Sequence, residues 1–202
     1  MRKRKLIDGK VKKLALMAVL TAVALIIFII EAQFPLPVPI PGVKLGLANA
    51  VTLFALFFGS GSSHDAAGKA PAVHIESEVK DENDASLSHI NVFIMLLCRI
   101  ILGAVFSGRL VALAYSFTGG LLGFAAQIAL KRFVTRRQIW VCGAVGGVFH
   151  NVGQIIAAAV VTGTAAVMIY LPVLIVAGVF AGVITGLVAQ FAIERMSIKN
   201  KL

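Results

Sequence analysis

Long apolar segments alternate with polar ones along the chain. Because a helix needs about 20 apolar residues to cross a bilayer, each apolar segment predicts a membrane-spanning helix. The second segment is short for a full crossing, so we expect it to borrow from the loop before it or to stop within the bilayer. The six predicted spans are 14–30, 44–58, 90–106, 110–130, 139–161 and 168–191.

The segments between the predicted spans differ in kind. Ser107–Gly108–Arg109 is a tight connection suited to a helical hairpin, and Pro172 predicts the first turn of the last helix or a kink. Residues 31–46 carry proline at every second position from 35 to 41, which favours a stiff, extended loop. That loop is either a rim over a cavity or a spacer. Residues 59–89 hold six of the nine acids and predict a flexible cytoplasmic loop.

Composition and charge support a membrane protein. Hydrophobic residues make up 59% of the chain, well above the usual share in soluble domains, and the mean hydropathy is +0.94. The net charge of +10 is concentrated in three basic clusters: before the first span, between spans four and five, and after span six. With six crossings these clusters share one side, so the positive-inside rule predicts that both termini are cytoplasmic. We therefore expect one all-α integral membrane domain spanning residues 1–202.

Small residues recur at four-residue spacing in several spans, which lets helix backbones approach closely. Gly178, Gly182 and Gly186 form such a row in the sixth span, and Gly143 and Gly147 do so in the fifth. We expect these rows to pack helices within the chain. A narrower row in the first span, formed by Ala15, Ala18 and Ala22, suits either a partner protein or internal packing.

Polar residues inside the spans are the best pointers to function, because each must be hydrogen-bonded or face a cavity. Arg99 lies in the middle of its span, and Glu31 is the only acid near the membrane that could pair with it. Helical spacing places His150, Asn151 and Gln154 on one stripe. The alternatives are interhelical hydrogen bonds and an outward-opening pocket. The predicted pocket residues are Lys44, Asn49, Arg99, Tyr115, His150, Asn151 and Gln154.

The sequence contains no recognisable catalytic pattern. It has no paired carboxylates in the spans, no phosphate-binding glycine loop and no aspartate-rich motif of the kind that prenyl synthases use for magnesium. The two cysteines, Cys98 and Cys142, lie in apolar runs without metal-ligand spacing. We expect neither an enzyme nor a cofactor or metal site.

Three stretches resemble a known family: PIPGVKLGLANAVTLFAL, YSFTGGLLG and above all GAVGGVFHNVGQ. They resemble the bacterial Gx transporter family, whose members are often labelled heptaprenyl diphosphate synthase component I. That family is similar to the substrate-binding S components of energy-coupling factor (ECF) importers. The resemblance implies a six-helix bundle in the bacterial cell membrane, with a pocket near the outer face capped by the loop after the first helix. It also implies that small alanines of the first helix meet a transmembrane coupling subunit, and that ATPases reside in other chains.

Three hypotheses follow for the function. The first is an S-component-like subunit that captures a small anionic or amphipathic ligand from outside. The second is a non-catalytic membrane accessory of a polyprenyl diphosphate synthase or of another isoprenoid or quinone pathway enzyme. The third is a free-standing channel or carrier.

Overall fold

The structure is a computed structural model that describes residues 2–33, 44–58, 87–108 and 110–199. The predicted proline-rich loop and most of the predicted acidic loop lie outside these residues. Within them the chain forms helices and no strands. The elements are α1 (Arg2–Glu31), α2 (Asn49–Phe57), α3 (His89–Ser107), α4 (Leu110–Lys131), the 3-10 helix η1 (Arg136–Gln138), α5 (Ile139–Thr162), the 3-10 helix η2 (Ala165–Tyr170) and α6 (Leu171–Lys199).

Five of these helical segments are long and apolar enough to cross a membrane, whereas α2 is not. α2 has nine residues, which correspond to a length of about 14 Å, or about half of a typical hydrocarbon core. The prediction that the second span is short is therefore confirmed, and residues 44–48 before it are not helical. The described residues thus contain five helices that are long enough to span a membrane and one helix of about half that length.

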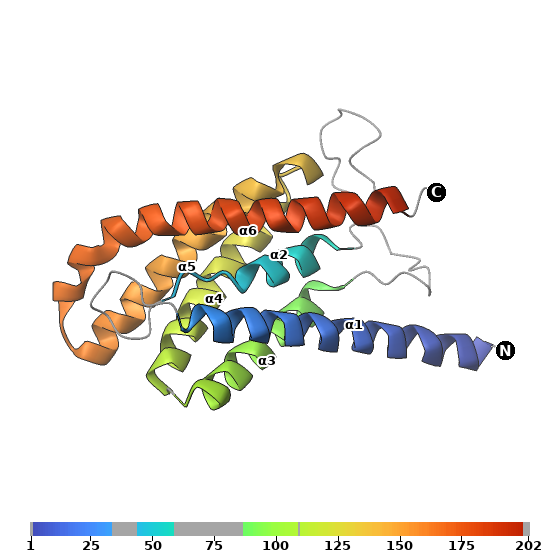
Figure 1. Cartoon of the computed structure of the whole chain (residues 1–202), viewed down its shortest axis with the longest axis horizontal. Helices are drawn as coiled ribbons and strands as arrows, with labels where there is room; N and C mark the ends of the chain where they lie inside the picture. The colour runs from blue at the N-terminus through green and yellow to red at the C-terminus, as the bar shows by residue number, and fades with distance from the viewer. Residues whose placement is uncertain (1, 34–43, 59–86, 109, 200–202) are drawn as a thin grey trace.

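The short helix α2 lies in the middle of the bundle, where it contacts all five other α-helices. Most of its apolar side chains are buried, and Leu53 and Leu56 belong to a core with Leu96 and Ile100 of α3. Around it, α5 packs between α4 and α6, while α1 lies along α3 (Figure 1). α1 begins and α6 ends at the same end of the bundle (Figure 1).

Glycines bring α5 and α6 into backbone contact. A Cβ atom added at Gly147 would collide with the carbonyl oxygen of Gly178, and one added at Gly143 would collide with that of Gly182. α4 approaches α5 in the same way, since a Cβ at Gly119 would lie 2.7 Å from the carbonyl oxygen of His150. The prediction that these glycine rows pack helices within the chain is confirmed.

Two features predicted for the connections are present in the described residues, whereas Arg109 of the predicted hairpin connection lies outside them. Gly108 follows the last residue of α3 with φ 63°, a left-handed conformation that glycine adopts readily, and α4 begins two residues later. Pro172 is the second residue of α6 and so stands in its first turn, where the missing N–H is not needed.

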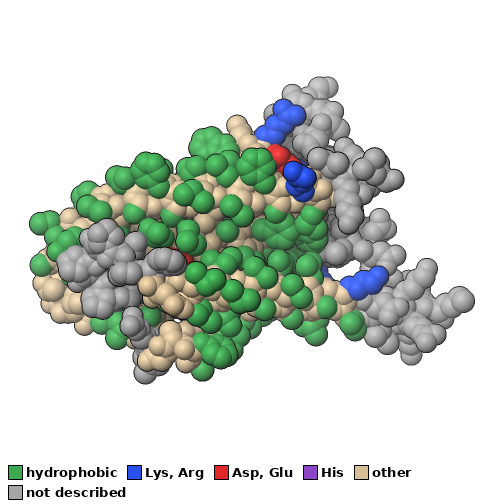
Figure 2. Space-filling view, viewed as in Figure 1, with side chains coloured by type: hydrophobic (Ala, Val, Ile, Leu, Met, Phe, Trp, Pro, Cys, Tyr) green, Lys and Arg blue, Asp and Glu red, His purple; other side chains and the backbone are tan. Residues whose placement is uncertain are grey.

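The surface of the bundle is apolar along most of its length. Figure 2 shows hydrophobic side chains spread over the helices, with Lys and Arg gathered at one end. On α6 the outward side chains include Val176, Phe180, Ile184 and Phe191, each at least 56% exposed. Since water would oppose such exposure and a lipid environment would not, the chain is a multi-pass membrane protein. We call the end with the Lys and Arg residues the basic end.

Candidate functional site

A set of buried polar side chains lies toward the end of the bundle opposite the basic end. We call it the polar cluster. These side chains come from the end of α1, the segment before α2, the first residue of α2, the middle of α3 and two positions of α5. Its members are Glu31, Lys44, Asn49, Arg99, His150 and Gln154, all 9% exposed or less.

Two of these side chains hold the non-helical segment 44–47. The side-chain amide of Gln154 donates to the carbonyl oxygen of Lys44 and accepts from its N–H, both at 2.8 Å. The Glu31 carboxylate accepts from the N–H groups of Gly46 and Leu47, at 2.5 and 3.0 Å. An extended backbone in a membrane needs partners for its polar groups, and here the two side chains supply them.

Gly46 brings this segment directly against α5. Its φ of 81° lies in the left-handed region that favours glycine. A Cβ atom at Gly46 would lie 2.8 Å from the His150 ring and 2.9 Å from the Asn49 amide nitrogen. Segment 44–47 therefore lies over the imidazole, in contact with it.

Arg99 occupies the centre of the polar cluster. Its Nη2 donates to Oδ1 of Asn49 at 3.2 Å and lies close to Gly120 of α4. Its Nε is buried and has no hydrogen-bond partner among the described residues, and the same holds for Nδ1 of His150. Buried polar atoms are seldom left without partners, so each of these two atoms is a candidate contact for a further polar group.

The charges of the polar cluster do not balance. Lys44 and Arg99 are cationic, whereas Glu31 is the one carboxylate, and it interacts electrostatically with both of them. A net positive charge therefore remains, whether or not His150 carries a proton. A buried site with this excess and with unpaired nitrogen atoms suits an anion. No group of His, Cys, Asp and Glu suited to a metal ion occurs within the described parts of the chain.

Two predicted pocket residues lie apart from the polar cluster. Asn151 follows His150 directly, but its amide turns toward α6 and donates to the carbonyl oxygen of Leu174 at 2.6 Å. Tyr115 is buried in an apolar cluster with Ile155 and Leu174. Hence the predicted stripe on α5 divides: His150 and Gln154 face the polar cluster, and Asn151 joins α5 to α6.

Comparison with known proteins identifies a family. A family model described as heptaprenyl diphosphate synthase component I matches residues 20–64 and 85–192. The chain belongs to this family. No curated protein and no solved structure matches it. The match confirms the resemblance seen in the sequence, because Gx transporter family members often carry that label.

The family match contains every residue of the polar cluster. It leaves out Ala15 and Ala18 near the start of α1 but includes Ala22. All three alanines are exposed, so the described structure does not use this row for internal packing. Glu31 was not among the predicted pocket residues. The available signal was its position as the one acid at the membrane end of the first span.

Proposed function

We propose that the protein is an S-component-like subunit of an ECF-type importer, which captures a small anionic or amphipathic ligand from outside the cell. The observation that carries this proposal is the buried guanidinium of Arg99, whose Nε has no hydrogen-bond partner among the described residues, together with the unpartnered Nδ1 of His150. Helix packing alone would not require a cation at this position, and charged side chains inside a membrane are costly.

The geometry supports a division of roles within the polar cluster. Arg99 carries a planar guanidinium, which binds carboxylate and phosphate groups in a bidentate manner. Asn49 orients it through the bond to Nη2. His150 offers Nδ1 as a second contact. Because segment 44–47 covers the imidazole, ligand entry requires this segment to move, and Gln154 and Glu31 hold it in the closed position.

The proposed orientation places the basic end in the cytoplasm. The excess of Lys and Arg at this end favours the cytoplasmic side of a bacterial cell membrane. The start of α1 and the end of α6 both lie at this end, which supports cytoplasmic termini (Figure 1). The polar cluster then lies in the outer half of the bilayer, where an external ligand reaches it.

The proposed partners are a transmembrane coupling subunit and ATPase subunits in other chains. The exposed row Ala15, Ala18 and Ala22 supports a contact with the coupling subunit, because small residues allow close helix approach in membranes. The alternative function is a non-catalytic membrane accessory of a polyprenyl diphosphate synthase. The description of the family favours this alternative.

Purification of the tagged full-length chain from its native membranes in mild detergent tests the ligand. We expect mass spectrometry to find a co-purifying anionic small molecule in the wild type. Arg99→Gln is expected to lower its occupancy by about tenfold or more, as the loss of a charged hydrogen bond implies. The matched control is Arg132→Gln, which changes an exposed arginine and is expected to retain the ligand. Unchanged occupancy in a folded Arg99→Gln protein would show that the polar cluster is structural.

The same purification tests the partners. Replacing Ala15, Ala18 and Ala22 with leucine should remove the coupling and ATPase subunits from the purified complex. Ala125→Leu introduces leucine at an exposed alanine of α4 and should leave the complex intact. Recovery of a soluble prenyl synthase in place of these subunits would favour the alternative function.

A further inference from the structure

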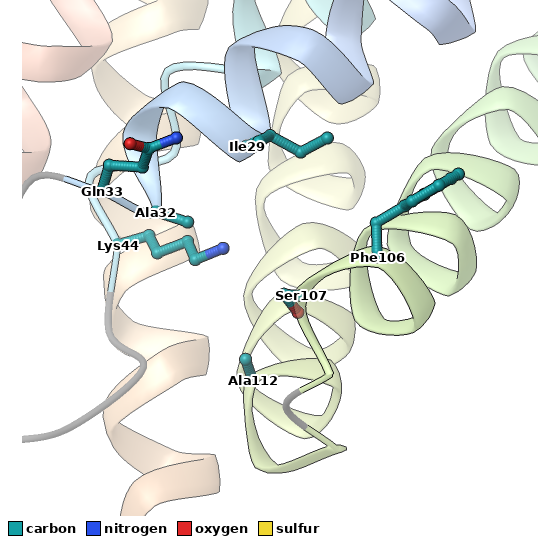
Figure 3. Close-up of a pocket in the computed structure, with 7 residues that line it drawn as sticks. All are labelled: Ile29, Ala32, Gln33, Lys44, Phe106, Ser107 and Ala112. Carbon is teal, nitrogen blue, oxygen red and sulfur yellow. The ribbon is translucent and has the colours of Figure 1, made fainter.

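A pocket separate from the centre of the polar cluster opens between the end of α1 and the α3–α4 hairpin. Its volume is about 220 Å³. Figure 3 shows Lys44 extending across it, with the ammonium group directed toward the hairpin. We call it the hairpin pocket. Its lining residues are Ile29, Ala32, Gln33, Lys44, Phe106, Ser107 and Ala112.

The walls of the hairpin pocket combine one cation with apolar groups. Lys44 is the charged residue among those that line it, and its Nζ lies 3.2 Å from the centre of the Phe28 ring. That ring stabilises the ammonium in a place with little water. Gln33 and Ser107 add polar groups, and the remaining lining residues are apolar. The pocket thus offers a positive charge beside a hydrocarbon surface.

The surface around the pocket is apolar as well. Phe106 is 67% exposed, the adjacent Val105 is 71% exposed and Ile30 on the α1 side is 52% exposed. In a membrane protein, side chains of this kind face lipid tails. A small anion dissolved in water would lose its hydration at this surface and gain no contact in return. An anion that already lies in the bilayer has a hydrocarbon chain, which makes favourable contact with the same surface.

The size of the pocket limits what it holds. A volume of 220 Å³ corresponds to about seven water molecules and falls below the range of about 300–1,000 Å³ typical of pockets that enclose a whole ligand. There is room for a charged head and the first few carbons. The rest of a longer chain would lie outside, along the exposed Phe106 and Val105.

We propose that the hairpin pocket binds the head of a single-chain amphiphilic anion, a carboxylate or phosphate with one hydrocarbon tail, which enters sideways from the bilayer between α1 and the α3–α4 hairpin. This inference deepens the proposed function, and it rests on that function for the import of the bound ligand. It assigns the ligand class and the route: Lys44 receives the anionic head, while the backbone of the same residue belongs to the closed segment 44–47.

A tryptophan reporter in the pocket tests this proposal. Phe106→Trp is combined with Trp140→Phe, which removes the single native tryptophan. The full chain is placed in phosphatidylcholine nanodiscs at pH 8 and titrated with 2-bromohexadecanoate or with 2-bromohexadecan-1-ol, whose bromine quenches tryptophan on contact. The comparison reporter is Val160→Trp, at a position that is 77% exposed near the end of α5.

We expect saturable quenching of Trp at position 106 by the carboxylate, with half-saturation about tenfold lower than for the alcohol. Lys44→Gln should raise this half-saturation by about tenfold, and Lys44→Arg should keep it within about twofold. Both substitutions leave the backbone atoms that Gln154 and Glu31 contact in place. The reporter at position 160 should show the same linear, unsaturated quenching with both probes.

Linear quenching at position 106 that is equal for both probes and unchanged in Lys44→Gln would overturn the proposal. Saturable quenching by water-soluble 2-bromobutanoate at the same concentration as by the long-chain probe would overturn the route from the bilayer. Arg99→Gln separates this inference from the proposed function. If quenching stays saturable while ligand occupancy in the purified protein does not depend on Arg99, the hairpin pocket stands and capture by the polar cluster fails.

Discussion

Gln154 is the side chain whose removal most directly tests how segment 44–47 is held. Gln154→Leu keeps the approximate size of the side chain but removes both its donor and its acceptor. The N–H and carbonyl groups of Lys44 then lose their partners on α5. The Glu31 contacts to Gly46 and Leu47 remain, so we expect the segment to open more often while the bundle stays folded.

The size of the effect follows from the number of bonds. Two hydrogen bonds are lost, and each contributes about 0.6–1.5 kcal/mol in the interior of a membrane protein. The free energy of opening should therefore fall by about 1–3 kcal/mol. This change corresponds to an increase of about 5–150-fold in the fraction of open molecules.

Cysteine labelling measures this fraction. Leu45→Cys places a thiol within the segment, at a half-buried position, in a chain where Cys98 and Cys142 have been replaced with alanine. The rate of reaction with a water-soluble maleimide should rise by the same factor in Gln154→Leu. Gln127→Leu is the matched control, because Gln127 is also buried but packs against Gly146, away from the segment.

An unchanged labelling rate in a folded Gln154→Leu protein would refute the reasoning, since the segment would then be held by contacts other than the Gln154 amide. An equal increase in Gln127→Leu would also refute it, because the change would then report a general loosening of the bundle. Circular dichroism and elution volume in detergent establish that each variant is folded.

Two further predictions concern the contacts of α5 with α6. Gly147→Val should lower the melting temperature strongly or prevent folding, because even a Cβ atom there collides with the Gly178 carbonyl, and overpacking costs about 1–3 kcal/mol or more. The control Ala129→Val, at an exposed position of α4, should leave the melting temperature unchanged. Equal melting temperatures of the two variants would contradict the described packing of α5 on α6. Asn151→Leu should lower the free energy of unfolding by about 1–2 kcal/mol, because one buried hydrogen bond to Leu174 is lost, while ligand occupancy in the purified protein stays the same. A tenfold loss of occupancy would instead place Asn151 in the binding site.

The long helices could be predicted from the sequence because apolar length alone identifies them. The segment before α2 could not. The apolar residues in 44–48 suggest that the helix begins there. Gly46 takes a left-handed conformation instead, and Glu31 and Gln154 hydrogen-bond to the backbone of this segment. These partners are distant in sequence, so composition does not reveal that the helix begins only at Asn49.

The candidate site could be predicted only in part. Arg99, His150 and Gln154 stand out because polar groups in apolar spans need partners, and the structure brings them together with Lys44 and Asn49. Helical spacing also predicted that Asn151 joins them. Adjacent residues on a helix point about 100° apart, however, and α6 lies close enough to offer the Leu174 carbonyl. Which neighbouring helix a side chain contacts depends on how the helices pack in the bundle, and the spacing of residues along one helix does not predict that packing.

Gln154 and Glu31 hold segment 44–47 through its main chain. Gln154 bonds to the N–H and carbonyl of Lys44, and Glu31 bonds to the N–H groups of Gly46 and Leu47. Neither contact depends on which side chains the segment carries, apart from the glycine conformation. Substitutions at positions 45 and 47 therefore leave these main-chain hydrogen bonds in place, whereas Lys44 also contacts Phe28 through its ammonium group. Under the proposed function, positions 45 and 47 are therefore where designed changes in ligand selectivity are best begun, because Gln154 and Glu31 keep their hydrogen bonds to the segment.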